Sequence, residues 1–177
     1  SSKTTEYVYA PVKGRIKWIP VSKGDDVISS IAEYGSLALI STDGLMQVEI
    51  ETTQELAMAS GVKVKWGDGS DSGKVAEKTA NGYLITLDDD KAPYNEPAEV
   101  YDGDTLLGEG ILAIHAPAAV YANGGTISKI HYDVNDKVKT TSKLFTLKNE
   151  PFSDSYQQKY AERIDMAGQL ETVLRYQ

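Results

Sequence analysis

Residues 8–27, VYAPVKGRIKWIPVSKGDDV, decide the fold, because residues 114–138, IHAPAAVYANGGTISKIHYDVNDKV, repeat their pattern. Ala10-Pro11 is echoed by Ala116-Pro117, and a constant shift of 111 residues then keeps further positions in register. The matched pairs are Gly14 and Gly125, Ile16 and Ile127, Ile19 and Ile130, Val21 and Tyr132, Gly24 and Asn135, Asp25 and Asp136, and Val27 and Val138. Chance rarely preserves so many positions, so we infer an internal duplication.

Each copy carries the residues of a bent strand between two turns. Proline removes a backbone donor and keeps its predecessor extended, so Ala-Pro ends one extended segment, and the following glycine permits a reversal. Gly-Asp in one copy and Asn-Asp in the other predict a left-handed closing turn, because Asn tolerates positive φ better than most residues. The predicted structural turn residues are Gly14, Gly24, Asp25, Gly125, Asn135 and Asp136.

The repeated pattern resembles a known half-motif. Ala-Pro-x-x-Gly-x-Ile, then Val-x-x-Gly-Asp-x-Val and an apolar strand (37–40, LALI; 144–147, LFTL), is similar to half of a biotinyl/lipoyl-type barrel-sandwich hybrid. With the stretch between the copies and the helical pattern after them, the chain resembles haemolysin-D-like membrane fusion proteins, the periplasmic adaptor subunits of export and efflux pumps. Their usual order is half-motif, hairpin, half-motif, barrel. The order here resembles that of longer, Gram-positive-type adaptors.

This departure leaves two pairings open for the half-motifs. They complete one another around an inserted barrel, or each pairs with a segment outside the sequence. We favour mutual pairing, because exposed edges of half a sandwich would associate with other chains. The expected architecture is mainly β: a lipoyl-like barrel-sandwich hybrid from 6–42 and 110–149, a small β-barrel domain at 43–109, and an α-helix at 150–177.

Local signals fill in the expected elements. Gly35 predicts the end of one helical turn within residues 28–35. The second copy lacks this segment, and its residues indicate no function. Asp43-Gly44 predicts a hairpin between strands at 37–40 and 46–50. Thr52 and Glu55 predict a capping box and a short helix before Gly61, and short strands at 62–66, 73–76 and 83–87 suit a small barrel.

The pattern changes to helical spacing after Phe152. Apolar residues recur at three- and four-residue steps, with charged residues between them. We expect the first arm of a coiled-coil hairpin, truncated at Gln177, with a helix packed on the barrel as the alternative. The apolar stripe predicted to bind a partner or a second copy consists of Tyr160, Ile164, Ala167, Leu170 and Leu174.

Composition excludes several classes of function. A net charge of −8 with scattered basic residues argues against nucleic-acid binding, and no segment is apolar enough to insert into a membrane. The absence of cysteine excludes a thiolate metal site and a cysteine nucleophile. The chain begins without Met and ends inside a helical pattern, so we expect it to be a fragment of a longer protein.

The search for chemistry finds one rival to the adaptor. Asp90-Lys91-Ala92 matches the signature of a lipoyl or biotinyl carrier, whose modified lysine would be Lys91, although the next Ala-Pro lies far downstream. Residues 68–73, DGSDSG, suggest a calcium loop, but Thr79 stands where a bidentate Glu is needed. His115 and His131 lack the partners that metal or nucleophile chemistry requires. We therefore predict no enzyme activity, no metal and no cofactor.

The resemblance implies a function in transport. It predicts a non-catalytic adaptor in the cell envelope, outside the cytoplasm, anchored by a membrane segment absent from this sequence. Such an adaptor couples an inner-membrane transporter, of the ABC or a similar class, to the path of efflux or secretion. The competing hypothesis is a carrier or accessory domain of an enzyme.

Overall fold

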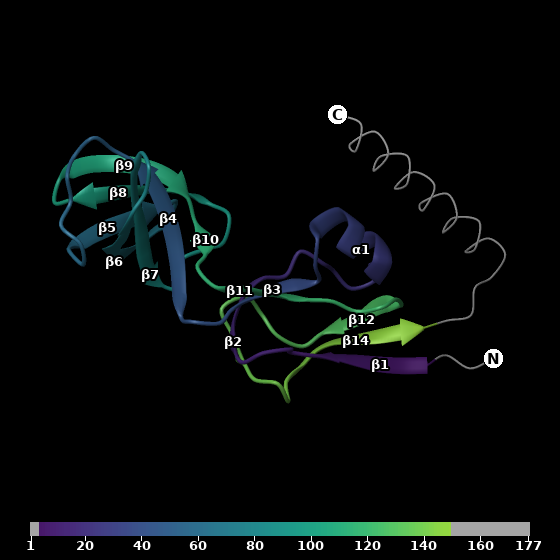
Figure 1. Cartoon of the computed structure of the whole chain (residues 1–177). Coiled ribbons are helices and arrows are strands. Elements are labelled where there is room, and N and C mark those ends of the chain that lie inside the picture. The colour runs from purple at the N-terminus through teal and green to yellow at the C-terminus, as the bar shows by residue number, and fades with distance from the viewer. Residues whose placement is uncertain (1–3, 150–177) are drawn as a thin grey trace.

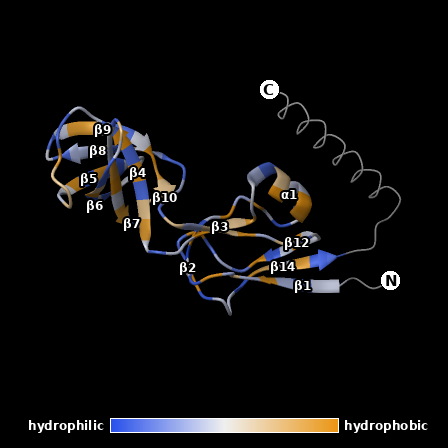
Figure 2. Cartoon of the chain, in the orientation of Figure 1, coloured by the Kyte–Doolittle hydropathy of each residue, from blue (hydrophilic) through white to orange (hydrophobic). Residues whose placement is uncertain are grey.

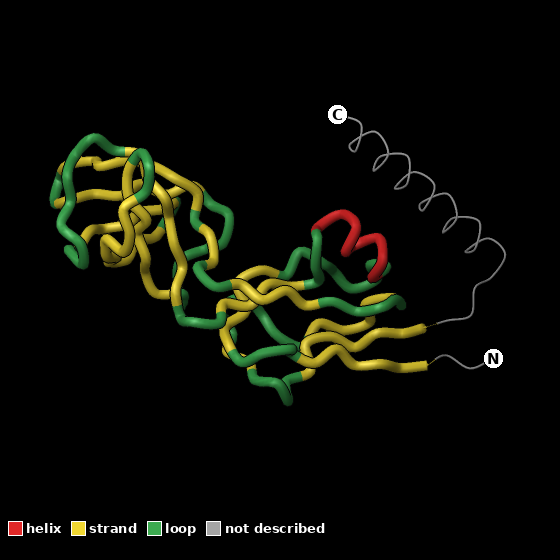
Figure 3. Tube along the Cα trace, viewed as in Figure 1, coloured by secondary structure: helices red, strands yellow, loops and turns green. Residues whose placement is uncertain are grey.

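The computed structural model describes residues 4–149, which form a mainly β structure with one short helix in that range (Figures 1 and 3). The elements in chain order are β1 (Thr4–Tyr9), β2 (Gly14–Trp18), α1 (Val27–Tyr34), β3 (Ala38–Ser41), β4 (Leu45–Glu51), β5 (Gly61–Trp66), β6 (Gly69–Lys78), β7 (Gly82–Asp88), β8 (Pro97–Asp102), β9 (Thr105–Ile111), β10 (Ala113–Ile114), β11 (Pro117–Val120), β12 (Thr126–Ile130), β13 (Lys137–Val138) and β14 (Lys143–Asn149).

The strands form three sheets. One has seven strands in the order β10-β4-β7-β6-β5-β8-β9, and we call it the half-barrel. The others have the orders β1-β14-β12 and β11-β3-β2-β13, and we call them together the repeat unit. Figure 1 shows the half-barrel and the repeat unit side by side, joined where the chain passes from β3 to β4 and returns from β10 to β11.

The half-barrel encloses its own hydrophobic core. Strand alternation supplies it, because every second residue of β4 (Met46, Val48, Ile50) is fully buried while the residues between them are more exposed. Glycine closes the curl: a Cβ on Gly110 of β9 would collide with the carbonyl oxygen of Glu49 in β4. A backbone-on-backbone approach of this kind needs glycine. Figure 2 shows the hydrophobic residues gathered on the strands and α1, with hydrophilic residues at most turns.

The two repeats build one core between them. β1 pairs with β14, β11 with β3, and β13 with β2, so each sheet contains strands from both copies. Both sheets contribute to one buried cluster that contains the matched residues Ile16 and Ile127. Full burial of such a side chain contributes roughly 1.5–3 kcal/mol relative to exposure. Mutual pairing of the copies, which we favoured, is the arrangement in the described residues.

The duplication extends to register and irregularities. Ile16 faces Ile40 and Ile127 faces Leu147, and a β-bulge follows each of them, before Trp18 in one copy and before Lys129 in the other. The alignment of the Ala-Pro pairs is wrong, however. Val120 occupies in β11 the place that Val8 has in β1, so the true counterpart of 8–10 (VYA) is 120–122 (VYA).

This correction has a sequence cause. A single extra residue lies between VYA and the glycine in the first copy, so a constant shift of 111 hides the identical tripeptides. Ala10-Pro11 does follow the end of β1, as expected. Pro117 instead begins β11, where its missing N–H costs no ladder bond at the strand start.

Two local predictions also fail. Asp43-Gly44 does not close a hairpin, because β3 pairs with β2 and β11 while β4 pairs with β7 and β10. The Asp-Gly turn carries the chain from one sheet to another, with Gly44 at φ 80°.

The short helix expected before Gly61 is also absent: residues 52–60 form no helix. Instead Ala59 N–H donates to Val75 O, and the Tyr83 hydroxyl accepts from Leu56 N–H, so tertiary contacts hold this stretch as a loop.

Helix α1 extends the prediction for residues 28–35. It has eight residues rather than one turn, and the Asp26 carboxylate caps it by accepting from Ser29 N–H at 2.9 Å. Gly35 ends it at φ 87°, as predicted, with its N–H donating to Ile31 O. The helix expected at 150–177 lies outside the described residues, as does its apolar stripe.

Candidate functional site

The predicted turn residues occupy two equivalent ends of the repeat unit. Gly24 N–H donates to Ile127 O and Asn135 N–H donates to Ile16 O, both at 2.7 Å. Gly24 and Asn135 have φ values of 95° and 80°, the left-handed backbone expected at both positions, and Gly125 also has a positive φ, of 97°. Each copy thus uses its turn to hold the strand of the other copy.

The aspartates of these turns also act alike. Asp25 accepts from Ser22 N–H and Asp136 accepts from Asp133 N–H, each through Oδ2 at 2.8 Å. Gly14 differs from the others, because it lacks a positive φ and is required for close approach. A Cβ there would collide with the carbonyl oxygen of Ser41. The six residues therefore serve turns and close packing in the structure.

Only one of the two ends meets the half-barrel, and a buried lysine lies there. Lys17 is 1% exposed, because the bulge in β2 turns it inward beside Ile16. Its Nζ donates to Asp89 O of the half-barrel and to Asn135 Oδ1, both at 2.6 Å. Asn135 therefore supplies both a left-handed turn and an acceptor that glycine, its counterpart in the first copy, could not supply.

Arg15 reinforces the same contact. Its Nε donates to Asp89 Oδ1 at 2.9 Å, and its Nη1 donates to Asn135 O at 2.7 Å. Burial lowers the pKa of Lys17 from 10.5 to about 8, with Asp89 opposing the shift and Arg15 adding to it. We call Arg15, Lys17, Asp89 and Asn135 the junction cluster.

Aromatic packing continues the junction. The Trp18 ring lies 5.4 Å from the Tyr94 ring of the half-barrel and 6.1 Å from the Tyr34 ring at the end of α1, the latter in a T-shaped arrangement. Ring pairs at these separations are favourable beyond their burial. Leu39 of β3 also packs against the core of the half-barrel. Contacts from β2, β3 and α1 thus meet at the junction.

The two connecting segments are held to each other. His115 Nδ1 lies 2.6 Å from Asp43 Oδ2, and Thr42 donates from both N–H and Oγ1 to Ala116 O. His131 lies within the repeat unit, with Nε2 2.6 Å from Thr146 Oγ1. Both histidines serve structural hydrogen bonds, and the described residues place no cysteine or second histidine beside either one.

The remaining sequence candidates lie on the half-barrel. Lys91 follows β7, with its side chain 58% exposed and Nζ 3.8 Å from Asp71 Oδ1. Asp71, Asp88 and Asp90 form the one acidic group in residues 4–149 whose ligand atoms converge within 4.8 Å. Asp68, which opened the suggested calcium loop, is not in that group, and an exposed acidic group with a lysine beside it is ordinary surface.

The junction cluster holds the repeat unit against the half-barrel. The Lys17 amine is buried and donates to two acceptors, so it is not presented to a substrate. Sequence reasoning missed this cluster, because a lysine between Ile16 and Trp18 in a strand predicts a solvent-facing side chain. The only trace in the sequence is the break in strand alternation between Ile16 and Ile19, which are both apolar although they lie three residues apart.

No family model matches the chain, and neither a curated protein nor a solved structure matches it. No helix in the described part of the chain is long and apolar enough to cross a membrane.

Proposed function

We propose that the chain is part of a non-catalytic adaptor of a transport system, of the haemolysin-D-like membrane fusion type. The observation that carries the proposal is the exchange of strands between two repeats, β1 with β14 and β11 with β3, around an inserted half-barrel. The repeat unit is, on this proposal, a barrel-sandwich hybrid and the half-barrel the adaptor's β-barrel domain. The junction cluster then has a role, since an adaptor needs a fixed orientation between its parts.

The test uses the full-length protein in its source cell. A photo-crosslinking residue replaces Met58, a half-barrel side chain that is 51% exposed. The expected result is a protein in the membrane fraction that crosslinks to an integral membrane transporter of the inner membrane. A full-length protein found only in the cytosol, without such an adduct, would overturn the proposal.

The carrier remains the second candidate because of Asp90-Lys91-Ala92. Carriers present their lysine on a tight hairpin of the sandwich itself, whereas Lys91 lies on the half-barrel beside Asp71. Intact mass after co-expression with a lipoyl or biotinyl ligase separates the two functions. We expect an unmodified chain, and a lipoyl or biotinyl adduct on Lys91 would favour the carrier.

We also propose self-association through the apolar stripe at 160–174. Lone apolar side chains on a short arm gain by pairing, since packing supplies most helical stability. Replacing Ile164 and Leu174 with Asp should convert a concentration-dependent oligomer into a monomer in sedimentation, with the melting of the β core unchanged. A strict monomer before mutation would refute the stripe's role as a partner face.

A further inference from the structure

The chain contains the tripeptide Ala-Asn-Gly twice, in two different structural settings. One copy is residues 80–82, at the turn between β6 and β7, and the other is residues 122–124, in the segment between β11 and β12. Asparagine followed by glycine is prone to spontaneous deamidation, because glycine has no Cβ to keep its nitrogen away from the asparagine side chain. Since the two tripeptides are identical, the fold decides which of them reacts.

Deamidation depends on one close approach within the chain. The glycine nitrogen loses its proton to solvent and attacks Cγ of the asparagine, and the Cγ–Nδ2 bond breaks. The leaving nitrogen takes up a proton and departs as ammonia, so a five-membered succinimide ring remains. Water then opens the ring at one of its two carbonyl carbons, which gives aspartate or isoaspartate. The backbone must therefore be able to bring the nitrogen against Cγ before the bond can form.

The fold holds the first tripeptide at two of its carbonyl groups. Asn81 O accepts from Thr52 N–H at 3.1 Å. Gly82 O accepts from Thr79 N–H at 2.9 Å. Gly82 is also buried against β4, where an added Cβ would collide with the carbonyl oxygen of Ile50. Rotation of the peptide between Asn81 and Gly82 would break the bond to Thr52 and press on β4, so this asparagine is protected.

The second tripeptide lacks such restraints. Within the part of the chain that the structure describes, residues 121–124 make no main-chain hydrogen bond, and the exposed Asn123 side chain has no hydrogen-bond partner. Gly124 has room around it, because the nearest atom to an added Cβ would be Ile28 Cδ1, at 4.0 Å. A segment with so few contacts changes its backbone angles at a low cost in free energy.

We propose that Asn123 is a site of spontaneous deamidation in the folded protein and that Asn81 is not. The product gains a negative charge and, as isoaspartate, an additional main-chain carbon two residues before Gly125. Gly125 O accepts from the N–H of Val27, the first residue of α1, at 2.9 Å, so the altered segment adjoins the start of that helix. The proposal rests on this segment alone and does not depend on the adaptor function.

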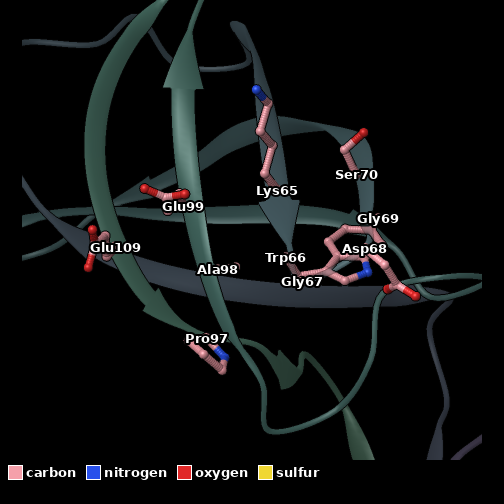
Figure 4. A pocket seen from close by; sticks show the side chains of 10 residues that line it. All are labelled: Lys65, Trp66, Gly67, Asp68, Gly69, Ser70, Pro97, Ala98, Glu99 and Glu109. Carbon is pink, nitrogen blue, oxygen red and sulfur yellow. The ribbon is translucent and has the colours of Figure 1, made fainter.

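Aspartate followed by glycine forms the same ring and has to be distinguished from the product at Asn123. Figure 4 shows one such pair, Asp68 and Gly69, at a groove of the half-barrel, where the backbone of Gly69 lies against the Trp66 ring. Ring formation at aspartate releases water instead of ammonia, so hydrolysis restores the original mass. Only asparagine gives the increase in mass that replacement of NH2 by OH produces. The other two pairs are Asp43-Gly44 and Asp102-Gly103.

The test incubates the folded 177-residue chain in mildly alkaline buffer, where the glycine nitrogen loses its proton more readily. Peptide mapping by mass spectrometry follows the mass increase separately for the peptides that contain Asn81 and Asn123. Labelling by isoaspartyl methyltransferase identifies isoaspartate in the same peptides. We expect conversion at Asn123 at least about tenfold faster than at Asn81, because breaking the restraints on residues 80–82 adds to the barrier. In urea, which unfolds the chain, the two rates should become similar.

The matched variant is Gly124→Ala. Gly124 has no positive φ, and an added methyl group meets only ordinary contact, so the variant should melt like the parent. Its methyl group hinders the nitrogen, so conversion at Asn123 should slow at least about tenfold. Undiminished conversion in this variant would overturn the proposed route through the glycine nitrogen.

Two results in the parent would also overturn the proposal. An Asn123 that stays intact in the folded chain but reacts in urea would show that residues 121–124 are held as firmly as residues 80–82. Equal rates at Asn81 and Asn123 in the folded chain would show that the fold does not select between the two tripeptides.

Discussion

Lys17 joins the repeat unit to the half-barrel, but burial of its charge lowers the free energy of unfolding. Its ammonium is buried, and two hydrogen bonds offset only part of the lost hydration, which is why its pKa falls to about 8. Arg15 faces it with the same charge, while Asp89 and Asp90 have the opposite one. The bonds fix geometry, and the charge itself weakens the folded state.

This gives a pH dependence with a defined sign. The unfolded chain holds the Lys17 proton up to about pH 10.5 and the folded chain only to about pH 8. Between these values the unfolded state binds more protons, so the contribution of Lys17 to the free energy of unfolding rises with pH, by about 3 kcal/mol over the window. We expect the stability of the parent relative to Lys17→Met to increase from pH 7.5 to 10 in urea titrations. A constant difference would show that the amine is not desolvated.

Gly14 is a residue whose role is steric. A Cβ added at Gly14 would collide with the main-chain carbonyl oxygen of Ser41, and main-chain atoms cannot rotate away as a side chain can. We expect Gly14→Ala to lower the free energy of unfolding by about 2 kcal/mol, as overpacking does. Gly61→Ala, where nothing lies within 4 Å, should change it by less than about 0.5 kcal/mol. Equal effects would contradict the close approach of β2 and β3.

At the scale of elements, the repeats can be tested against each other. Asp25 and Asp136 make the same side-chain bond to the residue three positions earlier. Each Ala substitution should cost about 0.5–1 kcal/mol, and the double variant should show the sum, because the two turns lie at opposite ends. Asp104→Ala, an exposed position between β8 and β9, is the control. Urea unfolding that shows a large cost at one turn and none at the other would contradict functional equivalence of the copies.

Elements were predicted best where the signal is periodic or repeated. Most strands, the left-handed turns and the stop at Gly35 follow from local chemistry. The failures arise where distant residues decide. Asp43-Gly44 has ideal hairpin residues, but the strands on either side of it pair with strands that are distant in the sequence, β3 with β2 and β11, and β4 with β7 and β10. Residues 52–60 satisfy their backbone through Val75 and Tyr83, which no local pattern reveals.

The junction cluster could not be predicted from the sequence, because its residues are also far apart in the chain. Lys17 meets Asp89 across 72 residues, and Arg15 meets Asn135 across 120. Each looks like a solvated charge in its own segment. The internal duplication was the one long-range signal in the sequence, and it predicted the shared core of the repeat unit but said nothing of what that core would face.

At the scale of the whole molecule, orientation is the property that the junction controls. The chain crosses between the units twice, and each unit has its own hydrophobic core. The two short connecting segments, joined by the Asp43–His115 contact, would by themselves let the half-barrel rotate relative to the repeat unit. Other contacts between the two units are needed to fix their orientation. Asp89 and the Trp18–Tyr94 pair supply such contacts on the half-barrel side.

We therefore expect Asp89→Ala with Trp18→Ala to free the orientation without unfolding either unit. Asp89→Ala leaves Arg15 without its carboxylate, at a cost of about 3 kcal/mol for a pair so little exposed, and this cost can be avoided by separation of the two surfaces. Residual dipolar couplings should fit one alignment tensor for the parent and need two for the variant, while amide shifts inside both cores stay in place. Asp71→Ala, which removes a weak surface pair with Lys91, should keep one tensor. If the double variant also keeps one tensor, the Lys17 bond to the Asp89 main-chain carbonyl and the connecting segments suffice to fix the orientation, and the Asp89 carboxylate and Trp18 contribute stability without controlling shape.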